Sequence, residues 1–192
     1  NTPGGGGGGG GGSRTGTTGS SVTVPPVTPA ADVNRDTSSD FTDMDGYAWA
    51  ADAVAELAKR NIIGGMGGGK FAPGENVTRE QFVKMIVLYA GKYSRTEKCD
   101  FSDVSPDEWY YSYVASAVKE GLINGISEDE FGTGQPISRQ DMAVIIQRTA
   151  KLETSENVAF TDGYKIGDYA KEAVSALAEN KIIIGDEDGR FR

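Results

Sequence analysis

The sequence repeats itself at a spacing of sixty residues, and this period limits the folds that the chain can adopt. Five positions recur in the same order in two successive stretches: Phe41 and Phe101, Trp49 and Trp109, Gly65 and Gly125, Phe71 and Phe131, Arg79 and Arg139. Repeats of this kind are supersecondary units that cannot bury an apolar face alone and must stack on their neighbours. The chain is therefore predicted to be an array of similar units.

A third copy begins at Phe160, one residue earlier than the period requires. It regains the spacing at Tyr169, which stands where the first two copies have Trp, and Gly185 and Phe191 then follow in step. The sequence reaches Arg192 before a third copy of the arginine segment. The predicted bounds are 40–99 and 100–158 for two whole repeats and 159–192 for an incomplete third.

Each repeat is predicted to be a helix, a loop and a second helix. Apolar residues recur at helical spacing in the first half of each repeat, and in the first repeat they are Ala50, Ala53, Val54, Leu57 and Ala58. Glycines then end the helix. The second helix follows a hydroxyl residue, because Thr78 and Gln81 form a capping-box pattern and Ser138 with Asp141 forms a weaker one.

The second helices are apolar on more than one side, so they are predicted to lie at the centre of a helical bundle. The phenylalanines of the first two repeats are predicted to be core residues: Phe41, Phe71, Phe101 and Phe131. The fold class predicted from these patterns is all-α, with tandem helix–loop–helix repeats.

Residues 1–39 differ in composition from the rest of the chain. Glycine fills positions 4–12, and Ser, Thr, Val and Pro follow. Such a segment is flexible at first and stiffer, polyproline-like further on, and it cannot bury a core. We predict a disordered linker here, and since the first residue is not Met we expect a further domain upstream.

The composition excludes several classes of function. The formal net charge of −9 argues against a nucleic-acid partner, which requires a basic surface. The chain has no His, the commonest general base and zinc ligand. Cys99 cannot form an internal disulfide, so we expect a lone thiol between repeats, with an intermolecular disulfide as the alternative. The sequence has no apolar stretch long enough to predict a helix that spans a membrane.

Arg79 and Arg139 stand at the first position of the second helices, where a cation is unfavourable. The positive end of the helix dipole opposes it by roughly 0.3–1 kcal/mol. Free backbone N–H groups, a capping hydroxyl and a guanidinium together favour an anion, and a guanidinium can bind a carboxylate at two points. The alternative is that each arginine pairs with Asp43 or Asp103 and fixes the turn.

The aromatic residues Trp49, Trp109 and Tyr169 recur just before or at the start of the first helices. They could form a surface on which a sugar stacks. Core packing is the interpretation that we favour, because an aromatic side chain at a fixed place beside a helix usually fills the core.

The whole pattern resembles the S-layer homology domain. The residues that carry the resemblance are Phe-x-Asp, an aromatic residue near the first helix, Gly and then Phe in the loop, and Thr/Ser-Arg before the second helix. The resemblance covers residues 41–192. It implies a pseudo-threefold helical bundle with ligand grooves between repeats, which binds secondary cell-wall polysaccharide, often a pyruvylated amino sugar, or modified peptidoglycan.

The family's Thr-Arg-Ala-Glu segment supplies groove residues, and the resemblance carries this role to two segments here. They are Thr78, Arg79 and Glu80, and more loosely Ser138, Arg139 and Gln140. The second segment has lost the Thr and the Glu. The implied function is non-covalent anchoring of a larger secreted protein to the bacterial cell wall or S-layer, without cofactor, metal or catalytic residue.

Two other functions stay open at this point. Residues 43–46 and 186–189 look like fragments of calcium loops, although neither has the Glu that completes such a loop. They suggest a calcium-dependent interaction module as the alternative, beside a segment for S-layer self-assembly. Acid pairs such as Asp43 and Asp45 give little support to an enzyme. The oligomeric state and the identity of the glycan are not predicted.

Overall fold

The computed structural model describes residues 41–153 and 160–192. The linker predicted over residues 1–39 lies outside the described residues. The described residues are helical, with isolated β-bridges but no strand. The elements are α1 (Ala48–Lys59), α2 (Arg79–Tyr89), α3 (Tyr111–Lys119), α4 (Arg139–Ala150), a short 3₁₀ helix (Gly163–Lys165) and α5 (Asp168–Glu179). The all-α prediction is confirmed, and the second helices begin at the two arginines.

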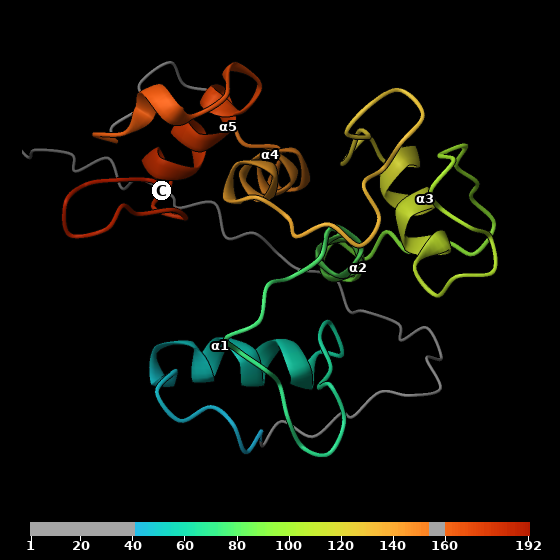
Figure 1. The fold of residues 1–192 in the computed structure, drawn as a ribbon, viewed down its shortest axis with the longest axis horizontal. Coiled ribbons are helices and arrows are strands. Elements are labelled where there is room, and N and C mark those ends of the chain that lie inside the picture. Colours follow the sequence, from blue (N-terminus) through green and yellow to red (C-terminus); the bar gives the residue numbers. More distant parts are fainter. Residues whose placement is uncertain (1–40, 154–159) are drawn as a thin grey trace, which may run out of the picture.

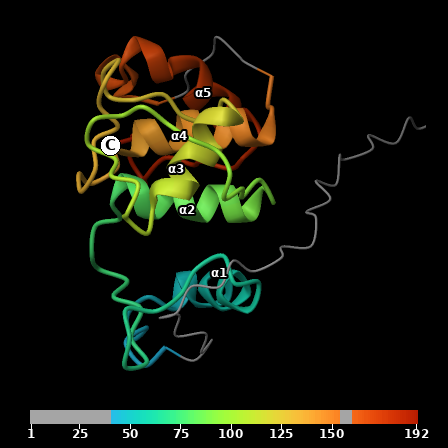
Figure 2. The ribbon, with the colours of Figure 1, turned by 90° about the vertical axis from the view of Figure 1, so that its right-hand side faces the viewer.

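The second helix of one repeat packs against the first helix of the next repeat. Helix α2 packs against α3, and α4 packs against α5 (Figure 1). Helices α2 and α4 also contact each other and form the centre of the described bundle. Figure 2 shows α1 to one side of the other four helices. Successive repeats therefore interlock.

The segments that precede α2 and α4 run beside each other. Thr78 and Pro136 form an antiparallel bridge, and the Arg79 N–H donates to the Gln135 carbonyl at 3.0 Å. Ile137 donates in return to the Val77 carbonyl at 2.9 Å. This pairing brings the beginnings of both central helices, and hence both arginine segments, to one end of the bundle.

The Phe-x-Asp turn fixes the loop of each repeat through its carboxylate. Asp43 accepts hydrogen bonds from the Phe71 and Ala72 N–H groups, both at 2.8 Å. Asp103 accepts three from residues 131–133, and Asp162 accepts two from residues 191 and 192. These bonds lower the pKa of Asp43 and of Asp162; for Asp103, burial opposes the lowering but does not prevent it.

The recurring glycine of the loop is required by close packing. A Cβ atom at Gly65 would lie 2.7 Å from the Phe41 ring, and one at Gly125 would lie 2.7 Å from the Phe101 ring. Both would also meet a backbone carbonyl oxygen at 2.6 Å or less. Gly therefore recurs at this position because a larger residue would clash with the Phe at the start of the repeat.

The predicted core phenylalanines all lie in or against the larger apolar core. Phe41 and Phe131 are buried, whereas Phe71 and Phe101 are half-buried and pack on them as tilted ring pairs. A smaller core joins α4 and α5 around Phe191. Cys99 is a free, half-buried thiol beside the larger core, and its burial raises the pKa of the thiol.

Candidate functional site

Arg79 lies in the contact between the first and second repeats. Its side chain packs on the Phe131 ring, with the guanidinium carbon 5.2 Å from the ring centroid, and its Nε donates to the Phe131 carbonyl at 2.9 Å. A terminal nitrogen lies 3.2 Å from the Asp141 carboxylate. The residue is only 5% exposed. The guanidinium is therefore neutralised and enclosed by groups of this chain.

Asp141 joins all three repeats around this arginine. It lies on α4 of the second repeat, pairs with Arg79 of the first, and accepts a hydrogen bond at 3.2 Å from the Tyr169 hydroxyl of the third. Ser138 donates to the same carboxylate at 2.7 Å and accepts from the Asp141 N–H at 3.0 Å, which completes the cap of α4. Burial and the Asp141 charge raise the pKa of Tyr169, so its hydroxyl stays protonated and donates.

Two more residues from the predicted groove segments contact the next repeat, and a third lies at the start of its own helix. Glu80 is buried and accepts from the Gly134 N–H at 3.1 Å. Gln140 accepts from the Gly167 N–H at 2.7 Å. Thr78 is half-buried, and its backbone N–H donates to the Gln81 side chain at 3.0 Å in the capping box of α2. Glu80 and Gln140 hold the loop of the next repeat through backbone groups.

Arg139 occupies the same motif position as Arg79 but remains exposed. Its guanidinium carbon lies 5.1 Å from the Phe191 ring centroid, as Arg79 lies over Phe131. One terminal nitrogen donates to the Ile184 carbonyl at 3.3 Å. Among the described residues, no carboxylate lies within ion-pair distance of it. Arg139 therefore lies on an apolar ring with a carbonyl partner and without a direct ion pair among the described residues.

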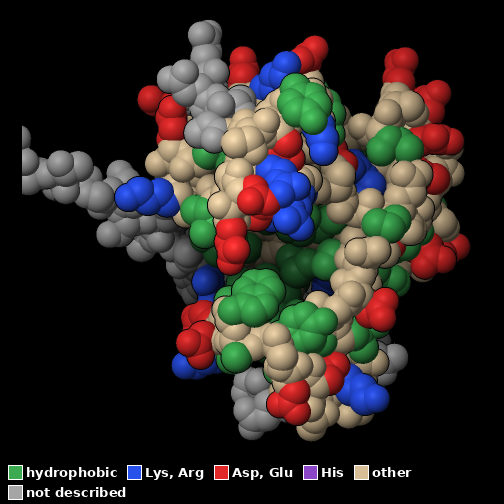
Figure 3. All heavy atoms as spheres, turned by 60° about the vertical axis from the view of Figure 1, so that its left-hand side comes forward, with side chains coloured by type: hydrophobic (Ala, Val, Ile, Leu, Met, Phe, Trp, Pro, Cys, Tyr) green, Lys and Arg blue, Asp and Glu red, His purple; other side chains and the backbone are tan. Residues whose placement is uncertain are grey.

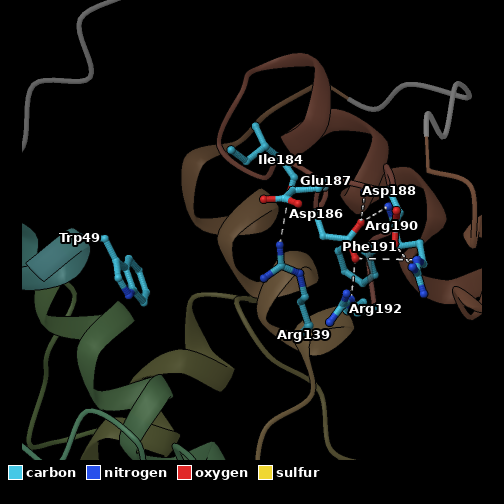
Figure 4. A pocket seen from close by; sticks show the side chains of 10 residues that line it. Trp49, Arg139, Ile184, Asp186, Glu187, Asp188, Arg190, Phe191 and Arg192 are labelled. Atoms are coloured by element: carbon cyan, nitrogen blue, oxygen red, sulfur yellow. Dashed lines mark hydrogen bonds and ion pairs between the residues drawn. The ribbon is translucent and has the colours of Figure 1, made fainter. Parts of the chain in front are cut away.

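Arg139 lines an open pocket of about 860 Å³. Figure 4 shows the arginine between Trp49 of α1 on one side and the loop of the third repeat on the other. The remaining lining residues come from that loop: Ile184, Gly185, Asp186, Glu187, Asp188, Arg190, Phe191 and Arg192. Figure 3 shows this face hollowed between a group of charged side chains and a group of hydrophobic ones.

The other charges of the pocket largely pair with each other. Arg190 pairs with Asp188, and Arg192 pairs with Asp186. The pKa of Asp186 is lowered chiefly by the Arg190 N–H that its carboxylate accepts. Two charged lining residues remain outside these pairs, the carboxylate of Glu187 and the guanidinium of Arg139, and of the two only Arg139 can receive an anion from solution.

The interpretation of the recurring aromatic residues as core is wrong. Trp49 is 84% exposed, Tyr169 63% and Trp109 47%. Trp109 contacts Tyr110 edge-on and has Lys84 over its face at 5.1 Å, whereas Trp49 turns its ring toward the pocket of Arg139 (Figure 4). Other residues of each first helix fill the core instead, among them Val54, Tyr113 and Val174.

The alternative pairing of the arginines with Asp43 or Asp103 is also wrong. Both carboxylates point to backbone N–H groups of their own loops. The carboxylate that pairs with Arg79 is Asp141, which the sequence shows only as a capping residue. Its second role depends on a contact between repeats, and no spacing within one repeat indicates it.

No group of three or more acidic or sulfur ligands converges to a metal-binding arrangement within residues 41–153 and 160–192. Asp43 is engaged by its loop, and Asp186 by Arg192 and two backbone N–H groups. None of the described helices combines the length and apolar character that a bilayer crossing requires.

The fold and the pocket define a class of protein with interlocked helix–loop–helix repeats. Its charged pocket lies where the first and second repeats meet the loop of the third. The S-layer homology domain family matches this chain over residues 40–83, 100–143 and 159–192. The chain belongs to that family. The three matches agree with the three predicted repeats in number and order.

Curated relatives carry the same repeats in different protein contexts. An exoglucanase, XynX, of Acetivibrio thermocellus is 32% identical over 74% of this chain and 14% of its own length. A surface-layer 125 kDa protein of Lysinibacillus sphaericus is 28% identical over 86% of this chain and 16% of its own. A cellulosome-anchoring protein of Acetivibrio thermocellus is 26% identical over 60% and 27%.

The chain spans less than a third of the length of these relatives. Enzymes and surface-layer proteins share the matched part, so the repeats are not tied to one catalytic activity. The family and these relatives place the chain at the cell surface, associated with the cell wall.

Proposed function

We propose that this chain is a non-catalytic anchoring module that holds a larger surface protein on the cell envelope by binding an acidic cell-wall polysaccharide. The observation that carries the proposal is Arg139, an exposed guanidinium in an open pocket without a carboxylate partner among the described residues. A sugar that bears a carboxylate, such as a pyruvate ketal on an amino sugar, supplies the charge that this group lacks.

The geometry around Arg139 suits a glycan more than a small free anion. The guanidinium offers paired donors to a carboxylate. Trp49 faces the same pocket from another repeat with most of its ring exposed, so the apolar face of a sugar ring can lie against it.

The two arginine segments therefore contribute differently to the proposed function. Of the six residues predicted to bind glycan, Arg139 is the one that lines this pocket. Arg79 and Glu80 are buried in the contact between repeats, so their proposed part is to hold the loops that shape the groove. Ser138 and Gln140 fix the helix start that carries Arg139.

The test is sedimentation of the chain with purified cell walls that carry the polysaccharide. Arg139→Ala should lower the apparent affinity by about ten- to a hundredfold, the size expected when a charge-assisted hydrogen bond of roughly 1.5–3 kcal/mol is lost. Lys119→Ala removes an exposed cation at the end of α3 and is the matched control, with unchanged sedimentation. Removal of the pyruvate from the polymer should release the parent chain.

An Arg139→Ala variant that sediments like the parent would contradict the assignment of this pocket. Equal losses for Arg139→Ala and Lys119→Ala would mean that wall binding depends on overall charge. Binding that survives removal of the pyruvate would assign a different group of the glycan to the arginine.

A further inference from the structure

Asn124 is the only asparagine of the sequence that is followed by glycine. The backbone nitrogen of the next residue can attack the side-chain amide carbon of an asparagine and close a five-membered ring. A side chain on that next residue hinders the attack. Gly125 has no side chain, so this hindrance is absent at Asn124.

Three other asparagines lie in the described part of the chain, and each is followed by a residue with a side chain. Asn76 is exposed, as Asn124 is, but it precedes the β-branched Val77. Asn180 donates its side-chain amide to the Ala176 carbonyl at 2.8 Å, which holds that amide in place. Exposure and an unhindered neighbour therefore occur together only at Asn124 among the described asparagines.

The chain around Asn124 lacks the hydrogen bonds that would hold it away from ring closure. Neither its exposed side-chain amide nor its backbone forms a hydrogen bond with any described residue. The same is true of the backbone of Ile123 and Gly125. Hydrogen bonding resumes at Ile126, whose N–H donates to the Glu130 carbonyl at 2.8 Å. The Gly125 nitrogen is therefore available as a nucleophile.

The reactive pair belongs to the second repeat alone. Gly64 and Ile184 stand where the second repeat has Asn124, and neither carries an amide side chain. The glycine that follows is common to all three repeats, and close packing requires it at Gly125. The pair thus arises because an asparagine precedes a glycine that the fold cannot replace.

We propose that Asn124 is a site of spontaneous deamidation in the folded chain, and that its isoaspartate product loosens the loop that receives Arg79. The deprotonated Gly125 nitrogen attacks the side-chain carbonyl carbon, a C–N bond forms, and the amide nitrogen leaves as ammonia. Water then opens the cyclic imide. Cleavage of its bond to the side-chain carbonyl gives aspartate, and cleavage at the backbone carbonyl gives isoaspartate. One water is consumed for each ammonia released, and no oxidant is needed.

The loop has no room for the atom that isoaspartate adds to the backbone. A Cβ atom at Gly125 would lie 2.3 Å from the carbonyl oxygens of Ser127 and Glu130 and 2.7 Å from the Phe101 ring. Isoaspartate lengthens the main chain by one carbon directly before this glycine, so the glycine must move against closely packed neighbours. Ordinary aspartate keeps the main chain and adds only a charge at an exposed position.

The loop that follows Gly125 carries groups that enclose the first arginine segment. The Phe131 carbonyl accepts from the Arg79 Nε at 2.9 Å, and the Gly134 N–H donates to Glu80 at 3.1 Å. A shift that begins at Gly125 therefore reaches the contact between the first and second repeats.

The direct test is peptide mapping by mass spectrometry after incubation of the whole chain in mildly alkaline buffer. Asn124 should be converted at least tenfold faster than Asn76, and an isoaspartyl methyltransferase should label the product. Acidic buffer should slow the conversion, because less of the Gly125 amide is deprotonated. Asn124→Gln should slow it at least tenfold, because the longer side chain must close a six-membered ring.

Hydrogen exchange of the incubated chain tests the effect on the loop. The Phe131 amide proton, which Asp103 accepts at 2.8 Å, should exchange at least tenfold faster than in the fresh chain. Phe71 is the matched control, because its N–H donates to Asp43 in the same way, and its exchange should be unchanged. Asn124→Asp should behave like the fresh parent chain, since it carries the new charge without the longer backbone.

Equal rates of conversion at Asn124 and Asn76 would overturn the proposal, because they would show that the fold keeps Asn124 from its neighbour. The proposal also fails if the incubated chain exchanges like the fresh one. It fails as well if Asn124→Asp alone reproduces the faster exchange, because the charge rather than isoaspartate would then loosen the loop. None of these measurements uses the polysaccharide, so their outcome is independent of the proposed glycan site.

Discussion

Arg79 and Arg139 share a sequence context, a position on their helices and a ring on which they lie, yet they end in opposite environments. Arg79 is enclosed and paired with Asp141, whereas Arg139 faces an open pocket. The difference comes from the neighbour that follows each arginine. Helix α4, the second helix of the next repeat, brings Asp141 to Arg79, and within the described residues no further second helix follows α4.

The comparison shows that the repeated motif fixes the position of the arginine on its helix, whereas the neighbouring repeat decides whether the guanidinium is paired or open. Both arginines offset an unfavourable position at the positive end of a helix by lying on an aromatic ring. Only the first adds a buried ion pair. Tyr169, which stands in the third repeat where the others have Trp, joins this ion pair, because its hydroxyl donates to Asp141.

The largest expected effect is a loss of stability in acid. It tests a feature that both arginine sites share, namely the loops that the Phe-x-Asp carboxylates hold. The folded-state pKa values of Asp43, Asp103 and Asp162 are lowered from 3.8. Their contribution to stability is therefore complete above about pH 4 and is lost as the pH falls through the lower folded-state values. Urea unfolding at pH 7 and pH 3 should show a marked loss in acid.

Asp103→Asn checks the cause of this acid loss. The variant should be less stable at pH 7 and should lose less on acidification than the parent chain, because the amide does not titrate. An unchanged pH slope would mean that other carboxylates dominate the acid response.

Arg79→Ala should separate the two arginines most clearly by stability. Removing Arg79 leaves Asp141 without its ion-pair partner and the Phe131 carbonyl without the Arg79 donor, and we expect a loss of about 2–3 kcal/mol in the free energy of unfolding. Arg139→Ala should cost no more than about 0.5 kcal/mol, as for an exposed residue. Chemical denaturation measures both, and equal losses would remove the distinction between a structural and an open arginine.

A double-mutant cycle sharpens the assignment of Asp141 as the partner of Arg79. The variants Arg79→Ala and Asp141→Ala should show a coupling free energy of about 1–2 kcal/mol. The same cycle between Arg139 and Asp141 should give coupling near zero, because Asp141 faces the other arginine. Strong coupling in the second cycle would show that the two sites are linked through the start of α4.

Tyr169→Phe should have the smallest effect of the series. It removes one exposed hydrogen bond to Asp141, so we expect a loss of about 0.5–1 kcal/mol in unfolding free energy. Trp49→Phe is the matched control for an exposed aromatic ring and should leave stability unchanged while weakening attachment to cell walls. A larger loss from Trp49→Phe would show that this ring packs more firmly than its exposure indicates.

Much of the fold follows from the sequence because its causes are local. The helical spacing of apolar residues, the glycines after the first helices and the caps at Thr78 and Ser138 act within a few residues. The sixty-residue period then requires stacking, since one unit cannot bury its apolar face. The expected core phenylalanines follow from the same pattern.

The aromatic residues and the arginines were harder to place from the sequence. Trp49 and Trp109 have large apolar side chains of the kind that usually fill a core. Their exposure depends on which side of the helix a neighbouring element covers. The ion pair of Arg79 joins positions sixty-two residues apart, and no pattern within a repeat contains that distance.

The sequence by itself determined the repeats, the helices within them and the presence of a cation at each second-helix start, because these depend on contacts close along the chain. The tertiary structure alone decided which cation is buried and which is open. Charge neutralisation at Arg79 requires Asp141 from another repeat to come within ion-pair distance, and packing between repeats brings it there.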